Sequence, residues 1–154
     1  MGLLIKIKDR LILCAFNGGI AATIANTFLY AVNIFLPGYT INMPETTAEF
    51  FLNINPDHID ILTRTLGFIW SMIVGGFYAI IYIISLELTG WNYLVAKALI
   101  IVSGGWLIGI GLVMKLVSIS QYTRGEPISI AAFFVAHLVF AISLGLLTKK
   151  IGVK

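Results

Sequence analysis

The sequence predicts an all-α fold, an integral membrane bundle of four transmembrane helices. Of its 154 residues, 59% are hydrophobic and only 11% are charged, whereas about a quarter of the residues in an ordinary soluble domain are charged. The apolar residues form four blocks, each long enough to cross a hydrocarbon core of about 30 Å. The length suits one domain, so we expect a single transmembrane domain over residues 1–154. The helices are expected over residues 11–36, 61–86, 94–118 and 128–147.

The first block follows the charged segment KIKDR and could be taken for a secretory leader. Its apolar run is much longer than the roughly 7–15 residues of a leader's hydrophobic region. We therefore expect it to remain in the protein as the first transmembrane helix. Cys14 lies just inside this helix and is the only cysteine, so it has no partner for an internal disulfide. We interpret it as a small buried apolar residue.

The connection over residues 37–60 is the only long one between predicted helices. Its segment MPETTAEFFLNI has Pro44 near the start, acidic residues early and aromatic residues later. This pattern is typical of a short helix on a membrane surface. The following segment, NPDHIDILTR, leads into the second transmembrane helix, with Asn55 expected as its N-cap and Pro56 at the first helical position.

The last two helices follow short connections. The segment LTGWNY, residues 88–93, predicts a tight turn at Gly90. Pro127 suits the first turn of the fourth helix. No proline interrupts any of the four apolar blocks, so the sequence gives no sign of a broken helix with a binding site at the membrane midplane.

Lysine and arginine residues are distributed unequally between the two ends of the predicted bundle. All but three of the ten lie on the side of the two termini, and the other side has only Arg64, Lys115 and Arg124. The positive-inside rule therefore places both termini in the cytoplasm and residues 37–60 outside the plasma membrane. The net charge of +3 reflects this topology, so we expect membrane lipid and no nucleic acid as a partner.

Small residues recur on one face of each predicted helix. Examples are Gly67, Ser71 and Gly75 in the second helix and Gly105 and Gly109 in the third. Helices in lipid associate through close packing at such residues. We therefore expect a compact bundle, within one chain, across a homo-oligomer or with a partner membrane protein.

A layer of polar side chains is predicted near the middle of the bundle. His137 lies halfway along the fourth helix, and Asn26, Ser71 and Trp106 lie at similar depth in the other three. A charge is costly at this depth, so we expect a neutral imidazole. Its N–H should donate a hydrogen bond to the side-chain oxygen of Asn26 or Ser71. Two interpretations stay open: the layer fixes the register of the helices, or His137 carries protons or binds a ligand.

Two basic residues near the outer end, Arg64 and Lys115, are candidates for binding an anion or a lipid headgroup. Arg64 lies four residues after Asp60, which also predicts a local ion pair. The acids of the long connection match no metal-ligand motif, so no metal site is predicted. The two histidines, His58 and His137, lie at different depths, which disfavours a haem held by both in one chain. No cofactor is predicted within one chain, and a haem shared at an oligomer axis through His137 stays open as an alternative.

Motifs for catalysis are absent from the sequence. It contains no GxSxG, no HExxH and no pair of acids within the apolar blocks, so an enzyme is not expected. Our first hypothesis is a small structural or accessory membrane protein that binds lipid or a partner protein. The alternative is an oligomeric transporter or channel subunit that uses the layer around His137, with the face of the second helix from Arg64 to Tyr82 as its lining.

Overall fold

The computed structural model of the protein describes residues 2–35, 43–52, 60–116 and 127–150, and these residues are almost entirely helical. The prediction of an all-α fold is confirmed for this part of the chain. In chain order, the elements are α1 (Gly2–Phe35), α2 (Met43–Leu52), α3 (Ile61–Thr89), α4 (Leu94–Trp106), the π-helix η2 (Leu107–Val113), α5 (Met114–Leu116) and α7 (Pro127–Lys149).

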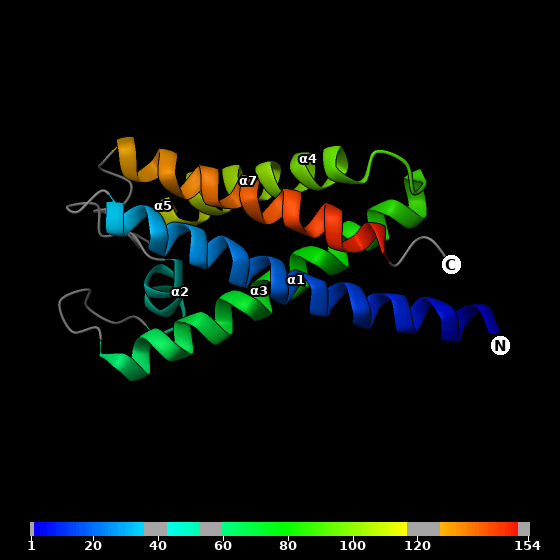
Figure 1. The fold of residues 1–154 in the computed structure, drawn as a ribbon, viewed down its shortest axis with the longest axis horizontal. Helices are drawn as coiled ribbons and strands as arrows, with labels where there is room; N and C mark the ends of the chain where they lie inside the picture. The colour runs from blue at the N-terminus through cyan, green and yellow to red at the C-terminus, as the bar shows by residue number, and fades with distance from the viewer. Residues whose placement is uncertain (1, 36–42, 53–59, 117–126, 151–154) are drawn as a thin grey trace.

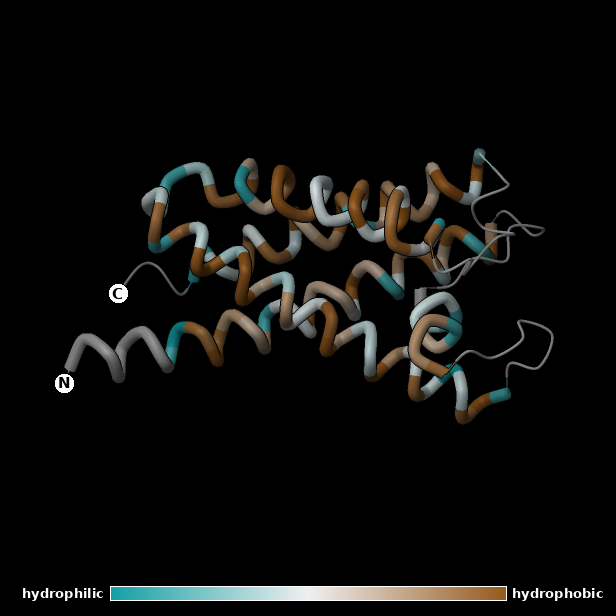
Figure 2. The backbone as a smooth tube through the Cα atoms, turned by 180° about the vertical axis from the view of Figure 1, so that it is seen from behind, coloured by the Kyte–Doolittle hydropathy of each residue, from teal (hydrophilic) through white to brown (hydrophobic). Residues whose placement is uncertain are grey.

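Four helical segments are long and apolar enough to cross a membrane: Asp9–Phe35, Ile61–Thr89, Leu94–Val113 and Pro127–Lys149. Hydrophobic residues run along these helices, and hydrophilic residues gather mostly near their ends (Figure 2). The four apolar blocks are thus helices, as predicted. The first helix begins at Gly2 and not near residue 11, because the lysines and the arginine before the apolar block are good helix formers.

α1 lies at the centre of the bundle, with α3 on one side and α7 on the other (Figure 1). α4 packs against α7 and makes few contacts with α3, although a short turn joins the two. α2 lies in the wedge between α1 and α3 (Figure 1). We call the end of the bundle nearest the two chain termini the terminal end, and the opposite end the α2 end.

α1 and α3 pack closely where glycines replace larger side chains. A Cβ atom on Gly18 would lie 2.8 Å from the carbonyl carbon of Gly75 and 2.7 Å from the Cβ of Ala79. One turn earlier in α1, the Cys14 Sγ donates a hydrogen bond to the Ala79 carbonyl at 3.3 Å. The small-residue face predicted around Gly75 therefore packs within the chain, and Cys14 is buried as expected.

α3 begins directly after Asp60, which caps it. The Asp60 carboxylate accepts a hydrogen bond from the backbone N–H of Thr63 at 2.7 Å. Hydrogen bonds from the Thr63 side chain and from its backbone N–H hold the pKa of the exposed carboxyl below its usual value. The predicted N-cap, Asn55, and the neighbouring Pro56 lie outside the described residues. With α3 starting at Ile61, the N-cap position belongs to Asp60.

The predicted ion pair between Asp60 and Arg64 is wrong. The Nε atom of Arg64 lies 3.1 Å from the Glu45 Oε1 atom of α2. Asp60 instead directs its carboxylate toward the backbone at the start of α3. Arg64 therefore connects α3 to α2, whereas the predicted partner lay only four residues away in the sequence.

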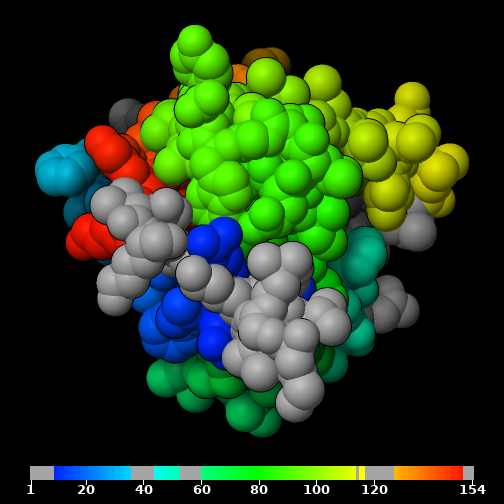
Figure 3. Space-filling model, turned by 90° about the vertical axis from the view of Figure 1, so that its right-hand side faces the viewer, coloured from blue at the N-terminus to red at the C-terminus, as the bar shows by residue number. Residues whose placement is uncertain are grey.

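The turn between α3 and α4 is fastened to both helices. Gly90 has a φ of 90°, in a region that favours glycine. The Lys97 Nζ atom donates to the Gly90 carbonyl at 2.7 Å, and the Tyr82 hydroxyl donates to the Leu94 carbonyl at 2.9 Å. In Figure 3, which looks onto the terminal end, residues of this region (green) cover much of the face, and the yellow η2–α5 segment projects at one side.

The third long helical segment changes from α- to π-helical geometry within the predicted span of residues 94–118. α4 ends at Trp106, and a π-helix of 7 residues follows it; residues 117 and 118 lie outside the described residues. The π-helix has the sequence LIGIGLV, and its two glycines disfavour a regular α-helix. Leu107, Ile108 and Leu112 are more than half exposed, so little packing holds this segment in the α-form. π-helical turns occur frequently at functional sites.

Candidate functional site

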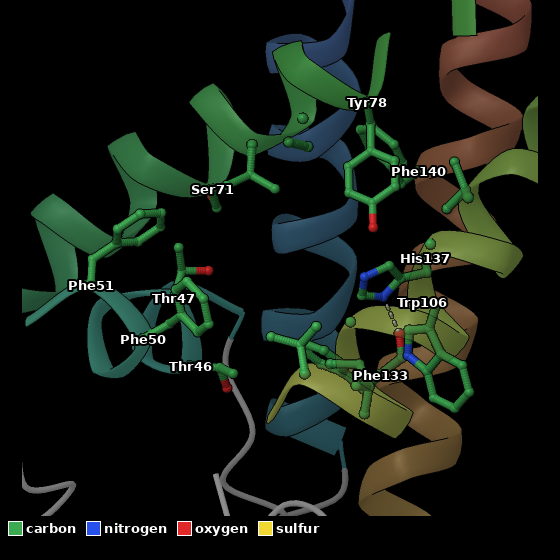
Figure 4. A pocket seen from close by; sticks show the side chains of 18 residues that line it. Thr46, Thr47, Phe50, Phe51, Ser71, Tyr78, Trp106, Phe133, His137 and Phe140 are labelled. Carbon is green, nitrogen blue, oxygen red and sulfur yellow. Dashed lines mark hydrogen bonds between the residues drawn. The ribbon is translucent and has the colours of Figure 1, made fainter. Parts of the chain in front are cut away.

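A cavity of about 240 Å³ lies between α3 and α4, and we call it the α3–α4 cavity. Side chains from α1, α2, α3, α4, η2 and α7 line it. Six of the 18 lining residues are aromatic, and several of their rings face the cavity (Figure 4). The aromatic residues are Phe50, Phe51, Tyr78, Trp106, Phe133 and Phe140.

The cavity lies beside one of the few contacts between α3 and α4. The Tyr78 ring packs over Gly105, where an added Cβ atom would lie 2.8 Å from the ring's Cζ. The same ring makes an edge contact with Phe140, with 6.1 Å between centroids. One turn beyond Gly105, Gly109 lines the cavity, and an added Cβ there would have no atom within 4 Å. The missing side chain of Gly109 thus leaves space open.

α2 forms the wall of the cavity at the α2 end. It packs tightly on α3, because a Cβ atom on Gly67 would lie 2.7 Å from the carbonyl carbon of Pro44 and 3.0 Å from the Cβ of Ala48. The rings of Phe51 and Trp70 lie 4.8 Å apart between centroids. The helical part of the long connection therefore belongs to the site. Its sequence pattern alone predicts an isolated surface helix.

The four residues of the predicted polar layer divide between two sides of the cavity. On one side, the Asn26 Nδ2 atom donates to the Ser71 Oγ atom at 2.7 Å, and Ser71 lines the cavity. Asn26 is only 1% exposed and does not reach the lining. On the other side, His137 and Trp106 line the cavity from α7 and α4. Three of the four predicted residues thus line the cavity, and Asn26 is joined to it only through its hydrogen bond to Ser71.

His137 makes its hydrogen bond within its own helix. Its Nδ1 atom lies 2.8 Å from the Phe133 carbonyl oxygen, so the predicted bond to Asn26 or Ser71 is wrong. The physical reason is that the carbonyl four residues earlier lies directly beside the imidazole in a helix. The ring also stands near the Phe133 ring, with 4.9 Å between centroids. These contacts leave the Nε2 edge of the imidazole facing the cavity (Figure 4).

Two buried polar atoms of this region have no hydrogen-bond partner among the described residues: Asn26 Oδ1 and Trp106 Nε1. An unpaired buried polar group costs about 1–3 kcal/mol. Trp106 is nevertheless held in place by Phe134, with 4.8 Å between the ring centroids. Of the two residues with an unpaired atom, only Trp106 lines the cavity.

Arg64 and Lys115 do not line the α3–α4 cavity. Arg64 is engaged by Glu45, and Lys115 lies exposed on α5 without an ion pair to any described residue. No described contact brings the two cations together. The anion or headgroup site predicted at these residues stays a prediction.

Sequence reasoning missed the α2 residue Phe50 and predicted Gly109 only as a packing residue. The spacing of Ser71 and Tyr78, seven residues apart on one face of α3, did indicate a shared surface, and both residues line the cavity. For Phe50 the sequence holds no comparable signal, because periodicity within α2 does not say which helix it will contact.

Comparison with known proteins identifies no relative: no protein-family model, no curated protein and no solved structure matches this chain. The functional interpretation therefore depends on the geometry of the cavity itself.

Proposed function

We propose that the protein is a multi-pass membrane protein that binds a small, uncharged, lipophilic molecule in the α3–α4 cavity. The observation that carries the proposal is the lining, which combines six aromatic side chains with a few hydrogen-bonding groups and contains no Asp, Glu, Lys or Arg. Ligand sites are typically apolar clefts with a few placed polar groups. An ion or a charged substrate would find no compensating charge there.

The size of the cavity limits the ligand. A cavity of roughly 150 Å³ can hold a benzene molecule, and the α3–α4 cavity measures about 240 Å³. It therefore suits a single ring with a short alkyl chain, or an aliphatic molecule of similar volume. One terminal segment of a longer lipid would fit equally well.

Access from the membrane interior supports the same function. The cavity lining includes Phe50 of α2 and Val113 of η2, which are 41% and 36% exposed. α3 and α4 make few contacts with each other, so the cavity has no packed helix pair closing it on that side. An apolar molecule dissolved in the bilayer would enter sideways without crossing water.

The proposed orientation follows the positive-inside rule. The terminal end, with most of the lysines and arginines, would face the cytoplasm of a cell whose plasma membrane contains the protein. The α2 end would then lie on the outer side, with α2 near the outer membrane surface. Association with a second copy or with a partner membrane protein remains part of this proposal. The face of α4 that includes Gly104, where an added Cβ has no atom within 4 Å, is available for it.

Filling the cavity tests the proposal. We would titrate propylbenzene into the protein in lipid nanodiscs and follow the midpoint of thermal unfolding, which rises when a ligand binds the folded state. Gly109→Leu places a side chain in the cavity. Gly111→Leu is the matched control, because it lies in the same π-helix, has no atom within 4 Å of an added Cβ and does not line the cavity.

We expect a saturable rise for the wild-type protein and for Gly111→Leu, and at least tenfold weaker binding for Gly109→Leu. The same response from all three proteins would show that propylbenzene acts through the surrounding lipid. The proposed function would then be wrong.

A transporter or channel subunit is a second candidate, and η2 is the observation that favours it. Transporters often place a binding site beside an irregular segment of a membrane helix, and Gly109 of η2 lines the cavity. This candidate predicts that the protein increases potassium or proton flux across liposomes, and that His137→Leu abolishes the increase. Flux equal to that of empty liposomes would reject it and leave ligand binding untouched.

A further inference from the structure

The α3–α4 cavity contains two hydrogen-bonding atoms that face each other. The first belongs to His137, whose Nδ1 atom contacts the Phe133 carbonyl at 2.8 Å. A carbonyl oxygen only accepts hydrogen bonds, so Nδ1 must carry the proton. The ring is neutral, because no anion lines the cavity to balance an imidazolium. In this tautomer the Nε2 atom has a free lone pair and acts only as an acceptor.

The second atom is the Tyr78 hydroxyl oxygen. It makes no hydrogen bond to any described residue, and Tyr78 lines the cavity. Its position is restricted, because the ring packs closely against Gly105 and makes an edge contact with Phe140. Figure 4 shows the hydroxyl pointing toward the His137 imidazole. The two groups form no direct hydrogen bond with each other, so both remain available to a third group.

We propose that the cavity recognises a hydroxyl group, which donates its proton to His137 Nε2 and accepts a hydrogen bond from the Tyr78 hydroxyl. The inference deepens the proposed function and depends on it. With the size limit given above, the ligand class is a small uncharged alcohol or phenol with an apolar body.

Other polar groups fit the pair less well. A ketone, ester or ether oxygen can accept from Tyr78, but it then places its own lone pairs against the lone pair of His137 Nε2. A primary amine would be mostly protonated in water, and the lining contains no carboxylate to receive it. A hydroxyl is both donor and acceptor, so it alone among these groups satisfies both side chains at one atom.

The test uses three probes of nearly equal size: 4-propylphenol, 4-propylanisole and propylbenzene. Binding to the wild-type protein in nanodiscs would be measured by thermal unfolding, with Gly109→Leu to subtract partition into lipid. A neutral hydrogen bond changes affinity by about 3–10-fold. We expect 4-propylphenol to bind about 3–10-fold more tightly than 4-propylanisole, which cannot donate, and 4-propylanisole more tightly than propylbenzene.

Two variants assign the preference to the proposed atoms. Tyr78→Phe removes only the hydroxyl, so 4-propylanisole should bind it no better than propylbenzene. His137→Phe keeps a ring of similar shape, so the advantage of 4-propylphenol over 4-propylanisole should disappear. The wild-type comparison needs no variant, so the inference remains testable if either substituted protein fails to fold.

The outcomes separate this inference from the proposed function. Equal, saturable binding of all three probes, lost in Gly109→Leu, would overturn hydroxyl recognition and leave the cavity as an apolar binding site. A phenol preference that survives both Tyr78→Phe and His137→Phe would also overturn it. Absence of saturable binding by any probe would reject the inference together with the function on which it depends.

Discussion

Asn26 and Ser71 join α1 to α3 through side chains at the level of the cavity, with 2.7 Å between the Asn26 Nδ2 and Ser71 Oγ atoms. Ser71→Ala would remove the acceptor and leave the amide of a fully buried residue unpaired. Such interhelical hydrogen bonds in membranes contribute about 0.6–1.7 kcal/mol. We expect Ser71→Ala to lower the free energy of unfolding by about this amount, measured in mixed micelles with increasing sodium dodecyl sulfate.

Thr65→Ala is the control for this substitution. Thr65 lies on the same helix, is exposed, and its hydroxyl donates only to the Ile61 carbonyl of its own helix at 2.8 Å. It should change stability by less than about 0.5 kcal/mol. If the two variants lose equal stability, the Asn26–Ser71 bond does not hold α1 and α3 together.

His137 shows what a sequence reveals about a buried polar residue and what it does not. Its depth follows from counting residues along an apolar block, and its candidacy as a functional residue follows from that depth. Its partner does not follow. The Phe133 carbonyl is a backbone acceptor, and counting residues between helices cannot weigh it against side chains on other helices.

At the scale of elements, glycines decide how closely α1 and α3 approach. A Cβ atom on Gly75 would lie 2.8 Å from the Cβ of Ala22 and 3.3 Å from the carbonyl carbon of Gly18. Backbone atoms cannot rotate away, so Gly75→Ala would force the two helices apart. Overpacking of this kind costs about 1–3 kcal/mol. We expect a loss of that size in the same unfolding measurement.

Gly104→Ala provides the comparison, because an added Cβ there has no atom within 4 Å. Alanine favours a helix over glycine by about 1 kcal/mol, so this variant should be neutral or more stable than the wild type. Destabilisation of both variants to the same extent would mean that the loss at Gly75 reflects something other than contact with α1.

The extent of the helices was largely predictable, whereas the change from α- to π-helix in the third one was not. Block length and hydropathy place α3 and α7 within a few residues of their observed ends. The π-helix η2 depends on weak packing around two glycines, and packing is not visible in a run of apolar letters. α2 has the same limitation, since only the fit of Gly67 against Pro44 shows where it docks.

At the scale of the whole molecule, the order of helices in space differs from their order in the chain. α1 is central, while α3 and α4, which are consecutive among the long helices, barely touch beyond their turn. Small residues occur on every predicted helix, so the sequence alone allows several pairings. This arrangement creates the α3–α4 cavity, and it explains why sequence reasoning found the polar residues but not the space between them.

The orientation of the bundle in the membrane is the last prediction, and its basis is the unequal charge of the two ends. Cys14→Ala would remove the only cysteine, and single cysteines would then be introduced as Thr123→Cys and Val153→Cys. Lysine and arginine residues are held back on the cytoplasmic side during insertion. A membrane-impermeable maleimide applied to intact cells should therefore label Thr123→Cys but not Val153→Cys, and cell lysis should make both reactive.

Ile108→Cys, at an exposed position in the apolar part of η2, should stay unlabelled throughout if that surface faces lipid. Labelling of Val153→Cys in intact cells, with Thr123→Cys protected, would reverse the orientation and place α2 and its side of the cavity toward the cytoplasm.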